Sequence, residues 1–180
     1  MSSIQVPQEV LNTNSPSLAG ADLAGEDLRG MNFGSRDMRG AELDYSDLTG
    51  VQMRHAELGN ASMVMAELTL ADLRGANLSC ANLFGADLYG TDLRKANLEG
   101  AWLGGADLWD AQLSGARLRN ARYDYETRWP DGYRPELFGA IRVDLLIDAK
   151  QMPMPSKPTI GRRSRAIVKV RREPAAAHQA

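Results

Sequence analysis

The sequence predicts a solenoid, in which short similar units are stacked along one axis, and three observations support this prediction. Large apolar residues recur at every fifth position from Leu18 to Tyr123, which gives 22 repeats without a slip in register. The residue two positions before each of them is most often Ala, and the residue two positions after it is often Gly. A period of five fits neither an α-helix, which repeats about every 3.6 residues, nor a β-strand, which repeats every 2.

Each position of the five-residue unit has an expected role, with the central apolar residue as position i. Residue i should fill the interior, and residue i−2 should also point inward, where a narrow interior leaves room for only a small side chain. Residue i−1 is usually Asp, Asn or Glu. Gly at i+2, as at Gly75 and Gly90, suits the tight turn that must end a side of only five residues. The repeat occupies residues 16–125.

The stretch ADLRGANLSC at residues 71–80 shows the repeated unit A(D/N)LXX, which resembles the pentapeptide-repeat family. The resemblance implies an all-β fold, a right-handed quadrilateral parallel β-helix in which four repeats form one coil, so that the repeats make about 5.5 coils. Stacked coils would pair as parallel strands about 4.8 Å apart, which gives a rod roughly 26 Å long. Burial of each central leucine would contribute about 1.5–3 kcal/mol to stability.

Three segments lie outside the repeat. Residues 1–15 are expected to be an N-terminal segment that caps the first coil, and residues 126–149 to be a cap on the last coil. The stretch TRWPDGYRP resembles the terminal segment of bacterial family members, in which Trp129 and Tyr133 would cover the last core layer. Residues 150–180 are rich in Pro and basic residues and poor in apolar ones, so we expect a disordered tail there.

One outer face of the expected β-helix is acidic. Residues twenty apart should stack on one face, and on this face every i−1 residue is a carboxylic acid, whereas on the next face Arg54, Arg74 and Arg94 can neutralise the acids. Two interpretations stand side by side. The acids dock a basic partner or imitate a nucleic acid, or they are simply the residues that the family prefers at i−1 and they serve solubility. The five acids are Asp27, Asp47, Glu67, Asp87 and Asp107.

Aromatic residues and a basic segment are the other candidate contacts. Four aromatic residues at i−1 or i+1 should point outward and form a contact patch, unless the C-terminal segment folds back over them. A run of seven basic residues could bind nucleic acid or an anionic membrane, fold onto the acidic face, or stay in solvent. The aromatic residues are Phe84, Tyr89, Trp102 and Trp109, and the basic residues are Lys157, Arg162, Arg163, Arg165, Lys169, Arg171 and Arg172.

The sequence offers no catalytic, cofactor or metal site. It has neither a Gly-rich phosphate loop nor an HExxH or GxSxG motif, its only Cys is Cys80, and its two His are His55 and His178. The first residues lack the basic and apolar regions of a signal peptide, and no apolar run approaches the ~20 residues of a membrane span. We therefore expect a non-enzymatic protein without a cofactor, located in the bacterial cytoplasm.

Three functions fit these features. The first is a rigid scaffold for protein–protein interaction with an unknown protein partner. The second follows from the resemblance, because some family members are DNA mimics that act on bacterial DNA gyrase and give fluoroquinolone resistance. The repeat carries a net charge of −6, about one per 4 Å of rod, whereas duplex DNA carries one per about 1.7 Å. The third is a rod tethered by its basic tail to nucleic acid or membrane. The resemblance also implies a homodimer formed through the C-terminal cap.

Overall fold

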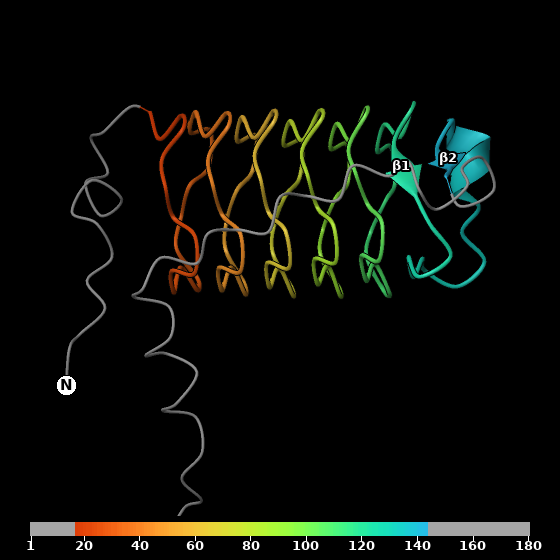
Figure 1. The fold of residues 1–180 in the computed structure, drawn as a ribbon, viewed down its shortest axis with the longest axis horizontal. Coiled ribbons are helices and arrows are strands. Elements are labelled where there is room, and N and C mark those ends of the chain that lie inside the picture. Colours follow the sequence, from red (N-terminus) through yellow and green to blue (C-terminus); the bar gives the residue numbers. More distant parts are fainter. Residues whose placement is uncertain (1–16, 144–180) are drawn as a thin grey trace, which may run out of the picture.

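The computed structural model describes residues 17–143, which form a rod of stacked coils (Figure 1). The expected N-terminal cap at residues 1–15 and the basic tail at residues 150–180 lie outside the described residues. The described part contains the 3-10 helix η1 (Pro135–Phe138), the strands β1 (Arg122–Tyr123) and β2 (Ile141–Arg142), and a series of single-residue β-bridges. Within residues 17–143 there is no helix with the length and apolar character of a membrane span.

From Ser17 to Trp102, parallel bridges join each i−1 residue to the residue twenty positions later, so four repeats form one coil in this part of the rod. The N–H of Leu68 donates to the carbonyl of Asp87 (2.7 Å), and the N–H of Asp87 donates to the carbonyl of Ala66 (2.9 Å). These ladder bonds connect neighbouring coils, so one coil cannot form them alone. Stability is therefore shared along the rod, as in other solenoids.

Each side of the rod ends in a β-turn. The N–H of Ala71 donates to the carbonyl of Leu68 (3.0 Å), and Leu70, at position i+2 of this turn, has a φ of 58°. A positive φ at the third turn residue is typical of type II turns and favours Gly. Ten residues other than Gly nevertheless take this conformation, all of them at i+2.

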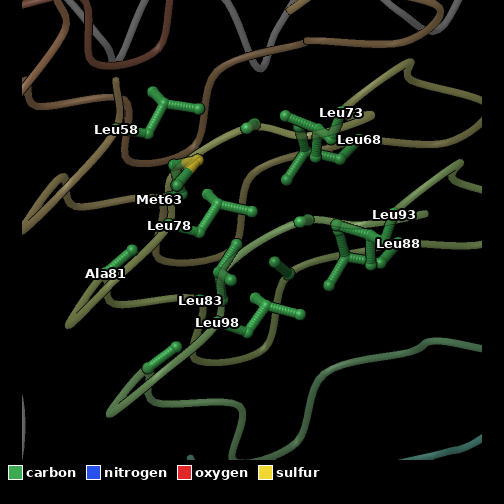
Figure 2. Close-up of a cluster of buried hydrophobic side chains, with 14 of the residues drawn as sticks. Leu58, Met63, Leu68, Leu73, Leu78, Ala81, Leu83, Leu88, Leu93 and Leu98 are labelled. Carbon is green, nitrogen blue, oxygen red and sulfur yellow. The ribbon is translucent and has the colours of Figure 1, made fainter. Parts of the chain in front are cut away.

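The interior is a stack of apolar side chains from successive coils. Figure 2 shows Leu58, Leu78 and Leu98 in a row along the rod, and each is 0% exposed. The Ala residues at i−2 are buried beside them, as their small size predicts. Ser46 and Thr91 take the place of Ala in two repeats, and their hydroxyls donate to backbone carbonyls at 2.7 and 2.8 Å. Both buried hydroxyls are thereby satisfied.

The C-terminal cap begins where the register changes. Asp107 pairs with Arg128, which is 21 positions later instead of 20. Strand β2 then pairs in parallel with β1, at the end of the rod where both are labelled in Figure 1. Four aromatic rings follow one another across this end, with centroids 5.2–5.5 Å apart, and they belong to Tyr123, Trp129, Tyr133 and Phe138.

Candidate functional site

The structure places the five predicted acids in one column, which we call the acidic column. Bridges link Asp27, Asp47, Glu67, Asp87 and Asp107 in this order, one residue in each successive coil. Because paired strands lie about 4.8 Å apart, like charges face each other at every step, and such pairs destabilise neighbouring strands. The acidic column therefore has an electrostatic cost unless cations neutralise it.

Aspartates of the acidic column also stabilise the corner that follows them. The N–H of Tyr89 donates to Oδ1 of Asp87 (2.9 Å). Asn does the same on another face, where the N–H of Phe84 donates to Oδ1 of Asn82 (3.2 Å). A side-chain oxygen that accepts from the backbone two residues later forms an Asx turn, which Asp and Asn favour. Part of the preference for Asp at i−1 is thus structural, and one oxygen of each such carboxylate is used at the corner.

Arginines neutralise the two ends of the acidic column. Arg29 contacts Asp27 at 2.5 Å and Asp47 at 3.3 Å, and the hydrogen bond and charge of Asp27 raise the pKa of Arg29. At the other end, Nη1 of Arg128 contacts Oδ2 of Asp107 at 2.6 Å. The basic residue at this second end comes from the cap and not from a repeat.

The middle of the acidic column is not neutralised in this way. Glu67 and Asp87 are exposed, and neither forms an ion pair with another residue of the described part. The i+1 positions, where an arginine could neutralise these acids, are occupied by the uncharged residues Thr69 and Tyr89. Negative charge therefore remains available to an outside partner at this point of the rod.

The neighbouring face has the same backbone geometry, but its charges are balanced. Arg74 contacts Asp72 at 2.8 Å and Asp92 at 3.5 Å, and Arg94 contacts Asp92 at 2.6 Å. The hydrogen bond from Arg94 is the main cause that lowers the pKa of Asp92. Arginines at i+1 can thus neutralise stacked acids on this fold, and the middle of the acidic column lacks them.

Exposed apolar side chains border the acidic column on both sides. Met65 lies two residues before Glu67 and is 48% exposed, and Leu70 lies three residues after Glu67 and is 64% exposed. Both occupy corners with positive φ, where a side chain costs about 1–2 kcal/mol. The sequence analysis missed them, although a large apolar residue at i+2, where Gly is usual, was a signal. We call the exposed residues along the column the apolar flanks: Tyr45, Met65, Leu70, Tyr89 and Trp109.

The four predicted aromatic contacts fall into two groups. Tyr89 and Trp109 are exposed beside the acidic column. Phe84 and Trp102 are half-buried on the preceding face. Both rings lie close to Gly104, where atoms of each would be 3.2 Å from an added Cβ. Because Gly104 has no side chain, the two rings have room to pack over it. They are therefore less available to a partner than Tyr89 and Trp109.

A cavity of about 420 Å³ lies at the C-terminal cap. Trp129, Tyr133 and Glu136 are among the residues that line it. The indole Nε1 of Trp129 and the hydroxyl of Tyr133 are buried and have no hydrogen-bond partner among residues 17–143, and burial raises the pKa of Tyr133. The carboxylate of Glu136 accepts a hydrogen bond from the hydroxyl of Tyr123, which lowers the pKa of Glu136.

The remaining candidate residues form no site in the described part. His55 and Cys80 are exposed at separate corners. Between residues 17 and 143 no cluster of His, Cys, Asp and Glu is suited to hold a metal ion. The seven basic residues between positions 157 and 172 lie outside the described residues.

Comparisons with known proteins agree with this geometry. A family model described as pentapeptide repeats (8 copies) matches residues 17–54, 52–90 and 91–122. Among solved structures, a pentapeptide repeat protein (Rfr23) from the cyanobacterium Cyanothece 51142 is 30% identical, covers 64% of this chain and 92% of its own, and has a TM-score of 0.63. No curated protein matches the chain.

Two further solved structures are similar over part of the chain. A pentapeptide repeat protein from the thylakoid lumen of Arabidopsis thaliana is 32% identical, with coverage of 55% of this chain and 66% of its own and a TM-score of 0.32. QnrB1, a plasmid-mediated fluoroquinolone resistance protein, is 22% identical, with coverage of 70% of this chain and 74% of its own and a TM-score of 0.38.

Proposed function

The chain belongs to the pentapeptide-repeat family, and from this premise we propose that it is a non-enzymatic, rigid rod that binds a protein partner through the middle of its acidic column. Proteins of this family are generally structural or interaction scaffolds rather than enzymes. The contact surface consists of the carboxylates of Glu67 and Asp87 together with the apolar flanks. The partner presents a basic surface that also contains apolar side chains.

One observation carries this proposal: the acidic column is unbalanced at its middle, and exposed apolar side chains border the same place. A cation from the partner, placed between Glu67 and Asp87, would relieve the repulsion between them. Met and aromatic residues such as those of the apolar flanks are enriched in protein interfaces. Because the ladder bonds already order the backbone, binding costs little conformational entropy of the rod.

The test compares two full-length variants that each lose three negative charges. The first removes charge from the acidic column, and its Asn residues can keep the corner hydrogen bonds. The second is the matched control and removes charge from the other faces. The first variant carries Asp47→Asn, Glu67→Gln and Asp87→Asn, and the second carries Asp22→Asn, Glu42→Gln and Glu57→Gln.

Immobilised wild type and both variants are used to capture proteins from a lysate of the source cells. We expect a partner that binds the wild type and the control, and that binds the acidic-column variant about tenfold more weakly. A Met65→Ser, Leu70→Ser variant should lose the same partner. If all four proteins capture the same partners equally, the acidic column and its apolar flanks are not the binding surface.

A second candidate function is modulation of bacterial DNA gyrase by DNA mimicry. The alignment of five acids in one column favours it. Arg29 and Arg128 neutralise the ends of that column, which favours the first candidate instead. A supercoiling assay with purified gyrase, titrated with the full-length protein with and without a fluoroquinolone, separates the two. Inhibition or drug protection that the acidic-column variant loses would support mimicry, and no effect would exclude gyrase as the target.

Further expectations from the sequence belong to the same proposal. We take the rod to be right-handed with about 5.5 coils and to act in the cytoplasm, where a homodimer would present two acidic columns. Tethering to nucleic acid or membrane would depend on the basic residues at 157–172 and not on the rod.

A further inference from the structure

We propose that the basic segment of this same chain, residues 157–172, lies on the middle of the acidic column and its apolar flanks, and that a protein partner must displace it. The docking itself follows from the charges and apolar surface of this chain. The competition with a partner rests on the proposed function.

The surface lacks a cationic and apolar counterpart within the described residues. Asp72 and Asp92 on the neighbouring face have arginines between them, whereas Glu67 and Asp87 have none. Met65 and Leu70 remain exposed beside them. A segment that covers this place should therefore supply positive charge and apolar side chains together.

Residues 157–172 have this composition. The segment contains seven basic residues and no acid, and apolar residues stand among them. Residues 17–143 contain 19 acids and 13 bases, so the rod has a net charge of −6, opposite in sign to the segment. The larger apolar residues of the segment are Ile160, Ile167, Val168 and Val170.

The segment can reach the surface from the point where the described chain ends. The N–H of Val143 donates to the carbonyl of Tyr123 (2.9 Å), on the side of the rod that precedes the acidic column in each coil. The thirteen residues 144–156 span up to about 45 Å when extended. Val143 lies one coil beyond Arg128, so Asp87 is three coil steps and Glu67 four coil steps away, which is roughly 15–20 Å along the rod. The extended linker is thus about twice as long as the distance along the rod that it must cover.

The covalent link makes such docking effective although each ion pair on a surface is weak. Covalent attachment through a short segment gives an effective concentration on the order of millimolar. A partner of the same basic and apolar chemistry must then compete with the segment. Replacement of the seven basic residues by Gln should therefore strengthen partner capture about tenfold, since the competitor is removed.

Carbodiimide cross-linking of the full-length protein tests the docking directly, because the reagent joins a Lys amine to a carboxylate in contact with it. Lys157 and Lys169 are the probes, and mass spectrometry identifies the linked residues. We expect cross-links to Glu67 and Asp87 to be about tenfold more abundant than those to Glu57, an exposed acid of another face. They should disappear in about 1 M salt, where the Debye length is about 3 Å.

Two outcomes would overturn the proposal. Equal cross-linking to Glu57 would mean that the segment does not select the acidic column. In a mixture of ¹⁵N-labelled and unlabelled protein, cross-links between the two labels would mean that the segment binds a second copy. The Glu67→Gln, Asp87→Asn variant has no carboxylate for the reagent at these two positions, so the cross-links that it still forms give the unselective background.

The cross-linking and capture experiments fail independently of each other. Cross-links to the acidic column would leave the docking intact, and they would refute the proposed function if even the variant with seven Gln residues captured no partner. A captured partner that depends on the acidic column, without cross-links, would refute the docking and leave the proposed function intact.

Discussion

The residue at each corner meets two constraints, a positive φ and the side chain of the coil before it. A Cβ added at Gly90 would lie 2.9 Å from Cδ2 of Leu70, and one added at Gly75 would lie 2.6 Å from Nδ1 of His55. In both cases the bulky residue stands twenty positions before the glycine. Gly at i+2 therefore allows the turn and also leaves space for the preceding corner residue.

Gly90→Ala and Gly50→Ala separate these two constraints, since both glycines belong to the same row of corners. Their φ values are 63° and 65°, and nothing lies within 4 Å of a Cβ at Gly50. Gly50→Ala should cost about 1–2 kcal/mol from φ alone. Gly90→Ala should cost about 0.5 kcal/mol more, because the exposed side chain of Leu70 must take another rotamer. Denaturant unfolding measures both, and equal losses would contradict the contact with Leu70.

Asp87 can be tested for its structural role apart from its charge. Asn keeps the hydrogen bond from the N–H of Tyr89 and removes the charge, whereas Ala removes both. Asp87→Ala should therefore be less stable than Asp87→Asn by about 1 kcal/mol in urea unfolding. Glu67 is the control, since no hydrogen bond joins it to its corner within the described part. Glu67→Ala and Glu67→Gln should differ little in their free energy of unfolding. If the Ala variant and the amide variant differ by the same amount at both sites, the corner bond of Asp87 is not the cause.

Asp92 should make stability depend on pH. Its pKa is lowered in the folded rod, chiefly by the hydrogen bond from Arg94, and the unfolded value is about 3.9. A carboxyl with a lowered folded pKa stabilises the protein above its unfolded pKa, and this stability is lost as pH falls through the folded pKa. Asp92→Asn should thus unfold more easily than the wild type at neutral pH. The difference in Tm between the wild type and Asp92→Asn should narrow below about pH 4. A difference that does not change with pH would refute the contribution of the lowered pKa of Asp92.

At the scale of the elements, the coil is the unit that the interior requires. Leu78 is fully buried in the row that Figure 2 shows between Leu58 and Leu98. Leu78→Lys places a charge in an apolar interior, which costs several kcal/mol, so the rod should unfold or open at this coil. Leu70→Lys makes the same substitution on an exposed corner and should change stability by about 0.5 kcal/mol or less. Circular dichroism and thermal unfolding compare them, and a Leu78→Lys variant as stable as the parent would refute the register.

Across the whole molecule, stability should spread from coil to coil and end at the cap. Trp129 packs against Tyr123 and Tyr133 (5.5 Å each between ring centroids) at the end of the rod. Trp129→Ala should weaken the last coil most, because each coil contacts only its neighbours. Amide hydrogen exchange should rise at residues 101–122 and change little at residues 37–57. A uniform rise along the rod would indicate that it opens as a single unit.

The candidate surface could be predicted only in part. A period of five and a coil of twenty align Asp27, Asp47, Glu67, Asp87 and Asp107, and the bridges confirm this alignment. The same pattern could not tell which of these acids lack a cation. Arg128 belongs to the cap, where pairing changes to 21 residues, so a count in steps of twenty does not reach it. Whether this surface binds a partner stays a prediction.

The sequence by itself determined which residues point inward and which residues share a face. A repeat without a slip assigns every side chain a direction and an alignment, and positions i and i−2 are buried in most repeats. Only the tertiary structure decided how the outer side chains are used. The partial burial of Phe84 and Trp102 at Gly104 and the ion pair of Arg128 both depend on contacts between coils. Such contacts follow from side-chain packing across the ladder and from the change of register at the cap, neither of which the repeat encodes.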